Sequence, residues 1–130
     1  LHIEITEAAA KEYLSQVRAL GVKLKTIGCR LVLDDFGHGS AYQYLQQLPV
    51  DMVKVAPGLI QDLAAQKGNQ TSVKSLTMVA HDLGIRVAAK FVEDAAVIDV
   101  LRGLNVDYAQ GFAIGRPMES IEQLRSMNSG

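Results

Sequence analysis

LVLDDFGHGS, residues 31–40, is an apolar run that ends in two adjacent carboxylates and a glycine-rich turn. The run is typical of a buried strand, and the turn places Asp34 and Asp35 at its carboxyl end, where α/β proteins keep their chemistry. Because neighbouring strand residues point to opposite faces, the two acids can share one ion or substrate only if the backbone turns there. Gly37 and Gly39 supply the freedom for that turn. The sequence therefore predicts a site built on paired carboxylates at the end of a strand.

Apolar runs and segments of helical spacing alternate on both sides of this strand. We predict further strands at residues 1–5, 50–55, 85–92 and 105–112, and helices at residues 8–26, 41–47, 72–83 and 94–104. Residues 59–65 start another helix, which a polar turn at residues 67–70 interrupts, and a last helix lies near residues 120–127. Regular alternation of this kind is typical of a parallel sheet built from right-handed βαβ units.

Composition and charge describe one ordinary globular domain. The 130 residues suffice for one core, with 48% hydrophobic and 21% charged residues. A net charge of -1 excludes a broad basic surface, so we expect no nucleic acid polymer as a partner and expect local charges to hold any anionic ligand. The single cysteine, Cys29, excludes an internal disulfide and is expected to be buried. No apolar run is as long as a membrane span, so we expect a cytoplasmic segment, with a membrane anchor left open for a longer parent protein.

Five short motifs occur in the order in which one known family carries them. They are EITE at residues 4–7, DDFGHGS at 34–40, LPVDMVKV at 48–55, AAKFVE at 88–93 and YAQGFAIGRP at 108–117. Together they resemble the signatures of the EAL domain family, the cyclic di-GMP phosphodiesterases of bacterial signalling. The resemblance covers nearly all of the chain but only the later part of a full domain, because the segment with the Glu-Ala-Leu tripeptide and the following strand with an Asn ligand are absent.

The resemblance implies an α/β fold, a TIM-like (βα) barrel of the EAL type. Residues 1–130 would then form a partial EAL-like domain of about five βα units, whereas a closed eight-stranded barrel needs roughly 200 residues or more. Open parallel edges are unfavourable. We therefore expect a homo-oligomer that pairs the strand at residues 1–5 or 105–112 with a second copy, or a parent protein whose earlier strands close the ring.

The resemblance also implies a two-metal site at the carboxyl ends of the strands. In the family two divalent cations, Mg²⁺ or Mn²⁺, activate a water that attacks one phosphodiester bond, and oxygen ligands suit such ions. Carried over by motif, the metal ligands are Glu4, Asp34 and Asp35, the catalytic residues are Lys54 and Glu93, and the substrate-binding residues are Asp35, Gln110 and Gly111. Lys54 would orient the nucleophilic water, and Glu93 would support the loop and the substrate end. Asp51 is expected as a structural partner near the start of its strand.

Two positions depart from the family's motifs. An aspartate of the metal site is Ala56 here, and the metal-ligating glutamate of the AAKFVE motif has become Lys90. The site thereby loses two negative charges and gains a positive one, and unit charges about 4 Å apart interact by roughly 4 kcal/mol at an effective dielectric near 20. We predict that Lys90 occupies the vacant metal position and pairs with Asp34, Asp35 or Glu4.

These departures give three hypotheses for function. The leading one is a degenerate EAL domain of a bacterial cyclic di-GMP signalling protein, which binds or regulates rather than hydrolyses, with its metal site impaired or without metal. The second is an active, metal-dependent phosphodiesterase that hydrolyses cyclic di-GMP to the linear dinucleotide, and the third is a scaffold whose acids are remnants. The family implies diguanylate-cyclase-like or sensory domains as neighbours. A hydrolysis assay separates the second hypothesis from the first, and nucleotide-binding calorimetry separates the first from the third.

Overall fold

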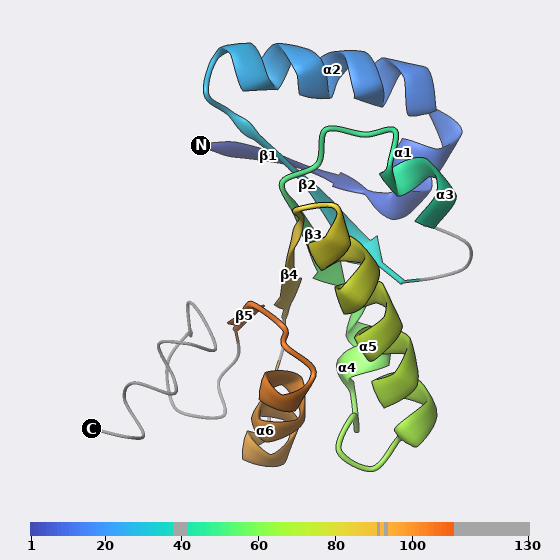
Figure 1. Cartoon of the computed structure of the whole chain (residues 1–130), viewed down its shortest axis with the longest axis vertical. Coiled ribbons are helices and arrows are strands. Elements are labelled where there is room, and N and C mark those ends of the chain that lie inside the picture. The colour runs from blue at the N-terminus through green and yellow to red at the C-terminus, as the bar shows by residue number, and fades with distance from the viewer. Residues whose placement is uncertain (38–41, 91, 93, 111–130) are drawn as a thin grey trace.

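Residues 1–37, 42–90, 92 and 94–110 are described by the computed structural model, and they form one parallel sheet with helices packed on it (Figure 1). The strands are β1 (His2–Thr6), β2 (Arg30–Phe36), β3 (Met52–Val55), β4 (Arg86–Ala89) and β5 (Tyr108–Ala109). The helices are α1 (Glu7–Glu12), α2 (Leu14–Thr26), α3 (Tyr42–Leu45), α4 (Pro57–Ile60), α5 (Lys67–Asp82) and α6 (Ala95–Gly103). The predicted helix near residues 120–127 lies outside the described residues.

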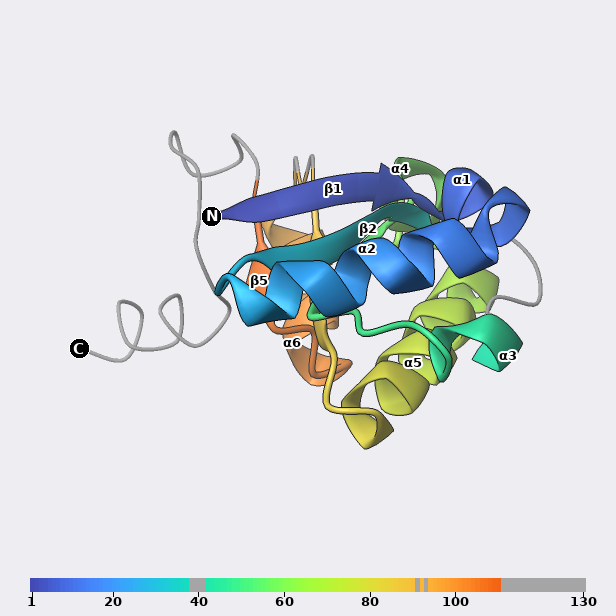
Figure 2. The same ribbon diagram turned by 90° about the horizontal axis from the view of Figure 1, so that it is seen from above.

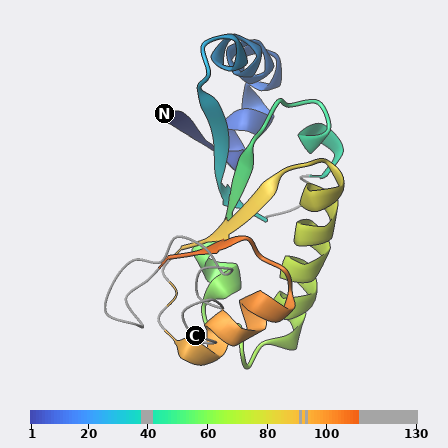
Figure 3. The same cartoon turned by 60° about the vertical axis from the view of Figure 1, so that its left-hand side comes forward.

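The sheet keeps the order of the chain. The strands lie side by side as β1-β2-β3-β4-β5, and every neighbouring pair is parallel. Helices α2, α5 and α6 lie along the same side of the sheet, as the turned views show (Figure 2, Figure 3). Sequential parallel strands with helices outside them form an arc of a (βα) barrel. The predicted α/β fold with five parallel strands is confirmed.

Alternation along the strands separates an apolar face of the sheet from a polar one. In β2, Leu31 and Leu33 are buried against the helices, whereas Arg30 is exposed and Asp34 is half-buried on the opposite face. The same core also contains buried residues of β3, β4, β5 and the helices, among them Val53, Val87, Ala109, Leu24, Leu76 and Leu101. Helices therefore cover the apolar face, and the polar face is the one that carries the candidate site residues.

Two smaller expectations concern Cys29 and the membrane. Cys29 is buried, as predicted, and its thiol lies 3.9 Å from the Arg30 carbonyl oxygen at the start of β2. Within the described ranges, no helix is both long enough and apolar enough to cross a bilayer.

The predicted helix over residues 8–26 is wrong in one respect, because two helices occupy this segment. Tyr13 joins them with φ −116° and ψ 45°, outside the helical region. Thr6 Oγ1 accepts the Ala9 N–H at 3.2 Å and caps the start of α1, about two turns before the break. Helix α1 is held at the carboxyl end of the sheet, where Glu7 contacts Gly37, whereas α2 packs along β2. Because α1 and α2 are held by these different contacts, the chain changes direction between the two helices.

The predicted polar turn at residues 67–70 is also wrong, because these residues form the first turn of α5. Gln70 Nε2 donates to the carbonyl oxygens of Leu63 and Ala64 at 2.9 and 3.3 Å, and Thr71 Oγ1 donates to the Lys67 carbonyl at 3.1 Å. These polar side chains satisfy backbone groups around the start of the helix, a role that composition alone does not reveal. The helix predicted over residues 59–65 is only the short α4, which ends before Asp62 at φ 55°.

We expect Gly21→Ala to destabilise the chain although alanine favours helices. A Cβ at Gly21 would lie 2.5 Å from Pro49 Cγ and 3.1 Å from Leu31 Cδ2, so α2 could not keep its close approach to the segment before β3. Overpacking of this kind costs about 1–3 kcal/mol, and over most of that range the cost exceeds the helix propensity gain of about 1 kcal/mol. Urea unfolding measures the difference. Gly68→Ala in α5 is the control, because a Cβ there meets nothing within 4 Å and should leave stability unchanged or raised.

Candidate functional site

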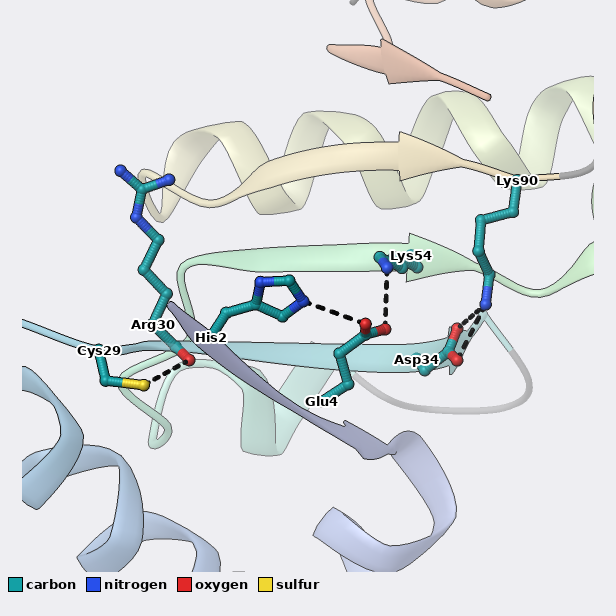
Figure 4. Close-up of polar contacts among 7 residues, drawn as sticks. All are labelled: His2, Glu4, Cys29, Arg30, Asp34, Lys54 and Lys90. Atoms are coloured by element: carbon teal, nitrogen blue, oxygen red, sulfur yellow. Dashed lines mark hydrogen bonds and ion pairs between the residues drawn. The ribbon is translucent and has the colours of Figure 1, made fainter. Parts of the chain in front are cut away.

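Two ion pairs cross the polar face of the sheet near the carboxyl ends of the strands (Figure 4). Lys90, directly after β4, places its Nζ 2.9 Å from Asp34 Oδ1 and 3.0 Å from Asp34 Oδ2. Lys54 of β3 places its Nζ 2.9 Å from Glu4 Oε1 of β1. The predicted pairing of Lys90 with a site carboxylate is confirmed, and the carboxylate is that of Asp34.

Strand period and register bring these side chains together. Lys54 pairs with Ala88 in the register of β3 and β4, and Lys90 lies two residues further along the chain, on the same face. Asp34 at the end of β2 and Glu4 in β1 point to that face as well (Figure 4). Three of the four charged side chains therefore come from the neighbouring strands β1, β2 and β3, and the fourth, Lys90, directly follows β4.

Both carboxylates favour their ionised form. The hydrogen bond from Lys54 is the main cause that holds the pKa of Glu4 below its usual value, against the opposing effect of burial. Partial burial acts to raise the pKa of Asp34, but hydrogen bonds from Lys90 and from the Asp35 N–H outweigh it, and the pKa of Asp34 is lowered. The Glu4 and Asp34 carboxylates are therefore ionised at neutral pH.

Asp35 turns away from Asp34 at the end of β2. Its backbone is left-handed, with φ 52°, and its N–H donates to Asp34 Oδ1 at 2.9 Å. The Asp35 side chain lines a separate pocket together with Thr6, Glu7, Ala8 and Lys11. The backbone does turn where the sequence predicts it, and the turn sends the Asp35 carboxylate to a different pocket from the one that Lys90 lines.

The part of the chain that the structure describes does not gather a divalent-metal donor set. Among these residues no group of three or more His, Cys, Asp or Glu side chains is placed to hold a metal ion. Glu4 and Asp34 each face an ammonium group, and Ala56 supplies no oxygen from its side chain. The described residues by themselves therefore do not fit the two-cation site that the motif resemblance implies, which needs several converging oxygen ligands.

A pocket of about 570 Å³ lies over the polar face of the sheet. Lys54, Lys90 and Gln110 contribute polar groups to its lining, together with His2, Arg30, Asp51, Arg86 and Tyr108. The Gln110 N–H donates to the Ala89 carbonyl oxygen at 2.9 Å, which places Gln110 directly after β5 and beside the end of β4. Glu93 and Gly111, the other two predicted site residues, lie outside the described residues.

Glu7 is a buried carboxylate beside the candidate site that the sequence did not single out. Glu7 is 3% exposed, and its Oε2 accepts the Gly37 N–H at 2.9 Å, so it anchors the backbone two residues after the paired acids. Gly37 has φ 123°, a conformation that a side chain would strain. The signal was present in the EITE motif, where Glu7 directly follows the capping residue Thr6.

Comparison with known proteins places this arrangement in a family. The family model described as "EAL domain" matches residues 1–117. This chain belongs to the EAL domain family. The cyclic di-GMP phosphodiesterase PdeB of Shewanella oneidensis is 41% identical over 115 residues, which are 88% of this chain and 13% of PdeB. The EAL chain therefore spans a small part of that relative's length.

Solved EAL structures share the fold of the chain. The EAL domain of FimX from Pseudomonas aeruginosa, bound to c-di-GMP, superposes with a TM-score of 0.82 at 30% identity, covering 93% of this chain and 50% of the solved FimX EAL domain. BlrP1 of Klebsiella pneumoniae, solved as a calcium/cyclic di-GMP complex, gives a TM-score of 0.81 at 31% identity, covering 90% of this chain and 30% of BlrP1. The EAL chain therefore spans half or less of these structures, and its five strands are part of a TIM-like barrel.

We expect the stability of the metal-free EAL chain to fall in acid. A carboxylate whose pKa is lowered by folding stabilises the folded state above its unfolded pKa, and the contribution is lost as pH falls through the folded pKa. The usual values are 4.5 for Glu4 and 3.8 for Asp34, so the loss should begin near pH 4.5 and continue below pH 3.8. Urea unfolding in EDTA at several pH values measures it. The variant Glu4→Gln, Asp34→Asn should show a shallower decline, and an equally steep one would contradict the assignment.

Proposed function

We propose that this EAL chain works in cyclic di-GMP signalling as a binding or regulatory part of a longer bacterial protein, without hydrolysing the nucleotide. Support for the nucleotide comes from its relatives, since PdeB is named a cyclic di-GMP phosphodiesterase and the FimX and BlrP1 structures contain cyclic di-GMP. Support for the loss of hydrolysis comes from the chain's own residues. The observation that carries this part is the contact of Lys90 with both carboxylate oxygens of Asp34.

Lys90 competes with a divalent ion for Asp34. Its ammonium group lies within hydrogen-bond distance of both oxygens through which the carboxylate would coordinate a metal. A cation that approached to about 4 Å would be repelled by the ammonium with on the order of 4 kcal/mol per unit charge at an effective dielectric near 20. Ala56 adds no compensating negative charge. In this proposal the Mg²⁺ or Mn²⁺ site of the family is therefore impaired, and hydrolysis is lost with it.

The pocket over the polar face is suited to an anionic nucleotide. Its volume of about 570 Å³ lies within the roughly 300–1,000 Å³ of small-molecule sites. Lys54 and Lys90 offer ammonium groups to phosphate oxygens, and the Gln110 amide offers a donor and an acceptor. Without a metal, these side chains are the groups that would orient the ligand.

Assembly and location follow from the same proposal. Strands β1 and β5 are the two ends of the described sheet, so each has one edge without a neighbouring strand in this part of the chain. Such edges are covered in stable proteins. We propose that a second copy, or further barrel strands of a longer cytoplasmic parent protein, covers them. Diguanylate-cyclase-like or sensory domains are the expected neighbours in that parent.

Calorimetric titration with cyclic di-GMP, once in EDTA and once in MgCl₂, tests the proposal. We expect binding in both buffers, with dissociation constants that differ by less than about threefold, because Lys90 is part of the protein and needs no added ion. Lys90→Glu is the control, and we expect it to lose binding in EDTA through repulsion of the phosphates. Binding that requires Mg²⁺ would contradict the metal-independent site, and absence of binding in both buffers would contradict the binding role.

The same samples test the loss of hydrolysis. After incubation with MgCl₂ or MnCl₂, chromatography is expected to show cyclic di-GMP and no linear dinucleotide. Formation of the linear dinucleotide at ordinary enzyme rates, about 1 s⁻¹ or faster, would show that the chain is an active phosphodiesterase.

A further inference from the structure

The four residues Leu-Pro-Val-Asp at 48–51 return as Leu-Asn-Val-Asp at 104–107. Each copy ends directly before a strand, β3 in the first case and β5 in the second. Three residues after each aspartate comes a residue of the candidate site, Lys54 after Asp51 and Gln110 after Asp107. The repeat therefore links a structural position at the amino end of a strand with a functional position at its carboxyl end.

Asp51 forms hydrogen bonds to β2 through both its backbone and its side chain. Its N–H donates to the Leu31 carbonyl oxygen at 2.9 Å, and its Oδ2 accepts the Leu31 N–H at 2.9 Å. Its carbonyl oxygen accepts the Arg86 N–H of β4 at 3.1 Å. These bonds confirm the expected structural role of Asp51. They fix the register of β3 relative to its neighbours β2 and β4.

Asp107 forms the equivalent hydrogen bonds to β4. Its N–H donates to the Val87 carbonyl oxygen at 2.9 Å, and its Oδ2 accepts the Val87 N–H at 2.8 Å. His81 at the end of α5 places Nε2 2.7 Å from the same Oδ2. Because the ladder of β5 contains only Tyr108 and Ala109, the Asp107 bonds are a large share of what fixes this strand.

In both copies the aspartate and the residue of the candidate site are three positions apart along the strand. A strand rises about 3.3 Å per residue, so the residue three positions after the aspartate lies roughly 10 Å along the sheet. Side chains alternate, so positions one and three after the aspartate share a face. They are Met52 and Lys54 in β3 and Tyr108 and Gln110 at β5, and all four line the pocket over the polar face. A slip by one residue would turn Lys54 or Gln110 away from that pocket.

We propose that Asp51 and Asp107 are positioning residues of the candidate site. Each fixes the register of its own strand and thereby sets the position at which Lys54 or Gln110 enters the pocket. The part of this inference that concerns nucleotide binding rests on the proposed function. The register itself is independent of any ligand, so the two claims can fail separately.

Amide hydrogen exchange of the full chain, followed by NMR, tests the inference at Asp107. Asp107→Leu is nearly isosteric and removes the acceptor. We expect exchange to accelerate by about tenfold at Val87 and also at Gln110 and Val92, because the Val92 N–H donates to the Gln110 carbonyl oxygen at 3.0 Å. The amide of Ala56, at the end of β3, should keep its protection. Asp107→Asn retains a weaker, neutral acceptor and should give a smaller acceleration at the same amides.

The matched control is Asp82→Leu, the same chemical change at an exposed aspartate of α5, which should leave all these amides unchanged. Acceleration confined to Val87 in both Asp107 variants, or equal acceleration throughout the sheet, would overturn the positioning role. If Asp107→Leu does not fold, Asp107→Asn decides alone, and unchanged exchange at Gln110 and Val92 would overturn the inference.

Nucleotide titration separates the positioning role from the proposed function. We expect Asp107→Leu to weaken cyclic di-GMP binding by about tenfold and Asp107→Asn by less than about threefold, with Asp82→Leu unchanged. If the wild-type chain binds no cyclic di-GMP, the proposed function fails, and the exchange data still decide the positioning role. If it binds and Asp107→Leu leaves the affinity unchanged, the functional part of the inference is wrong.

Discussion

The double variant Ala56→Asp, Lys90→Glu is expected to bind Mn²⁺ at least about a hundred times more tightly than the wild-type chain. It removes the ammonium group from Asp34 and adds two carboxylates at the positions where the family carries acids. The site becomes more negative by three charges, and hard oxygen ligands are the donors that Mn²⁺ prefers. Calorimetric titration with MnCl₂ measures the change, and Lys90→Glu alone should give an intermediate affinity.

A control with the same change in net charge distinguishes a local site from general electrostatics. Ala64→Asp and Lys74→Glu lie at exposed positions and together make the chain more negative by the same three charges. We expect this control to bind Mn²⁺ as weakly as the wild type. Equal gains in the two double variants would show that overall charge, and not the geometry around Asp34, controls metal binding.

Removal of the Lys90 ammonium without charge reversal has the second largest expected effect. Lys90→Met keeps the length of the side chain and leaves Asp34 with a neutral neighbour. We expect the free energy of unfolding at pH 7 in EDTA to fall by about 1 kcal/mol, which is below the roughly 1.5–3 kcal/mol of hydrogen bonds to charged groups. Solvent screens this pair, because the Lys90 and Asp34 side chains remain 21% and 24% exposed.

A double-mutant cycle assigns this loss to the pair. Asp34→Asn in the Lys90→Met background should cost less than Asp34→Asn in the wild type, because the partner is already gone. Lys74→Met, at an exposed position of α5, is the matched control and should change stability by less than about 0.5 kcal/mol. Additive losses from Lys90→Met and Asp34→Asn would contradict a direct interaction.

Sequence alone predicted most of the fold because the strands are short apolar runs and the helices between them carry clear spacing. The parallel order needed no further information, since strand and helix alternate regularly. The errors lie where a local contact overrides composition. Tyr13 breaks a helix that residues 8–26 would otherwise continue, and the polar residues at 67–70 start α5 because Gln70 satisfies neighbouring carbonyl groups.

In the candidate site, too, the sequence pattern predicted some features, and local contacts decided the others. The Lys90 pair with Asp34 was predictable, because a cation stands where the family has an acid and the strand ends of a parallel sheet meet at one edge. The direction of Asp35 was not, because it depends on one left-handed backbone angle at the end of β2. Glu7 was missed because its role comes from a contact with Gly37, thirty residues away in the sequence.

The central claim is that Lys90 takes the place of a metal ion at Asp34, and a crystal structure of the wild-type chain grown in millimolar MnCl₂ tests it most directly. Anomalous scattering locates any bound Mn²⁺ without ambiguity. Our account predicts that Lys90 Nζ stays within hydrogen-bond distance of both Asp34 oxygens and that no Mn²⁺ is coordinated by Asp34. Two well-coordinated ions beside Asp34, with Lys90 displaced, would contradict it.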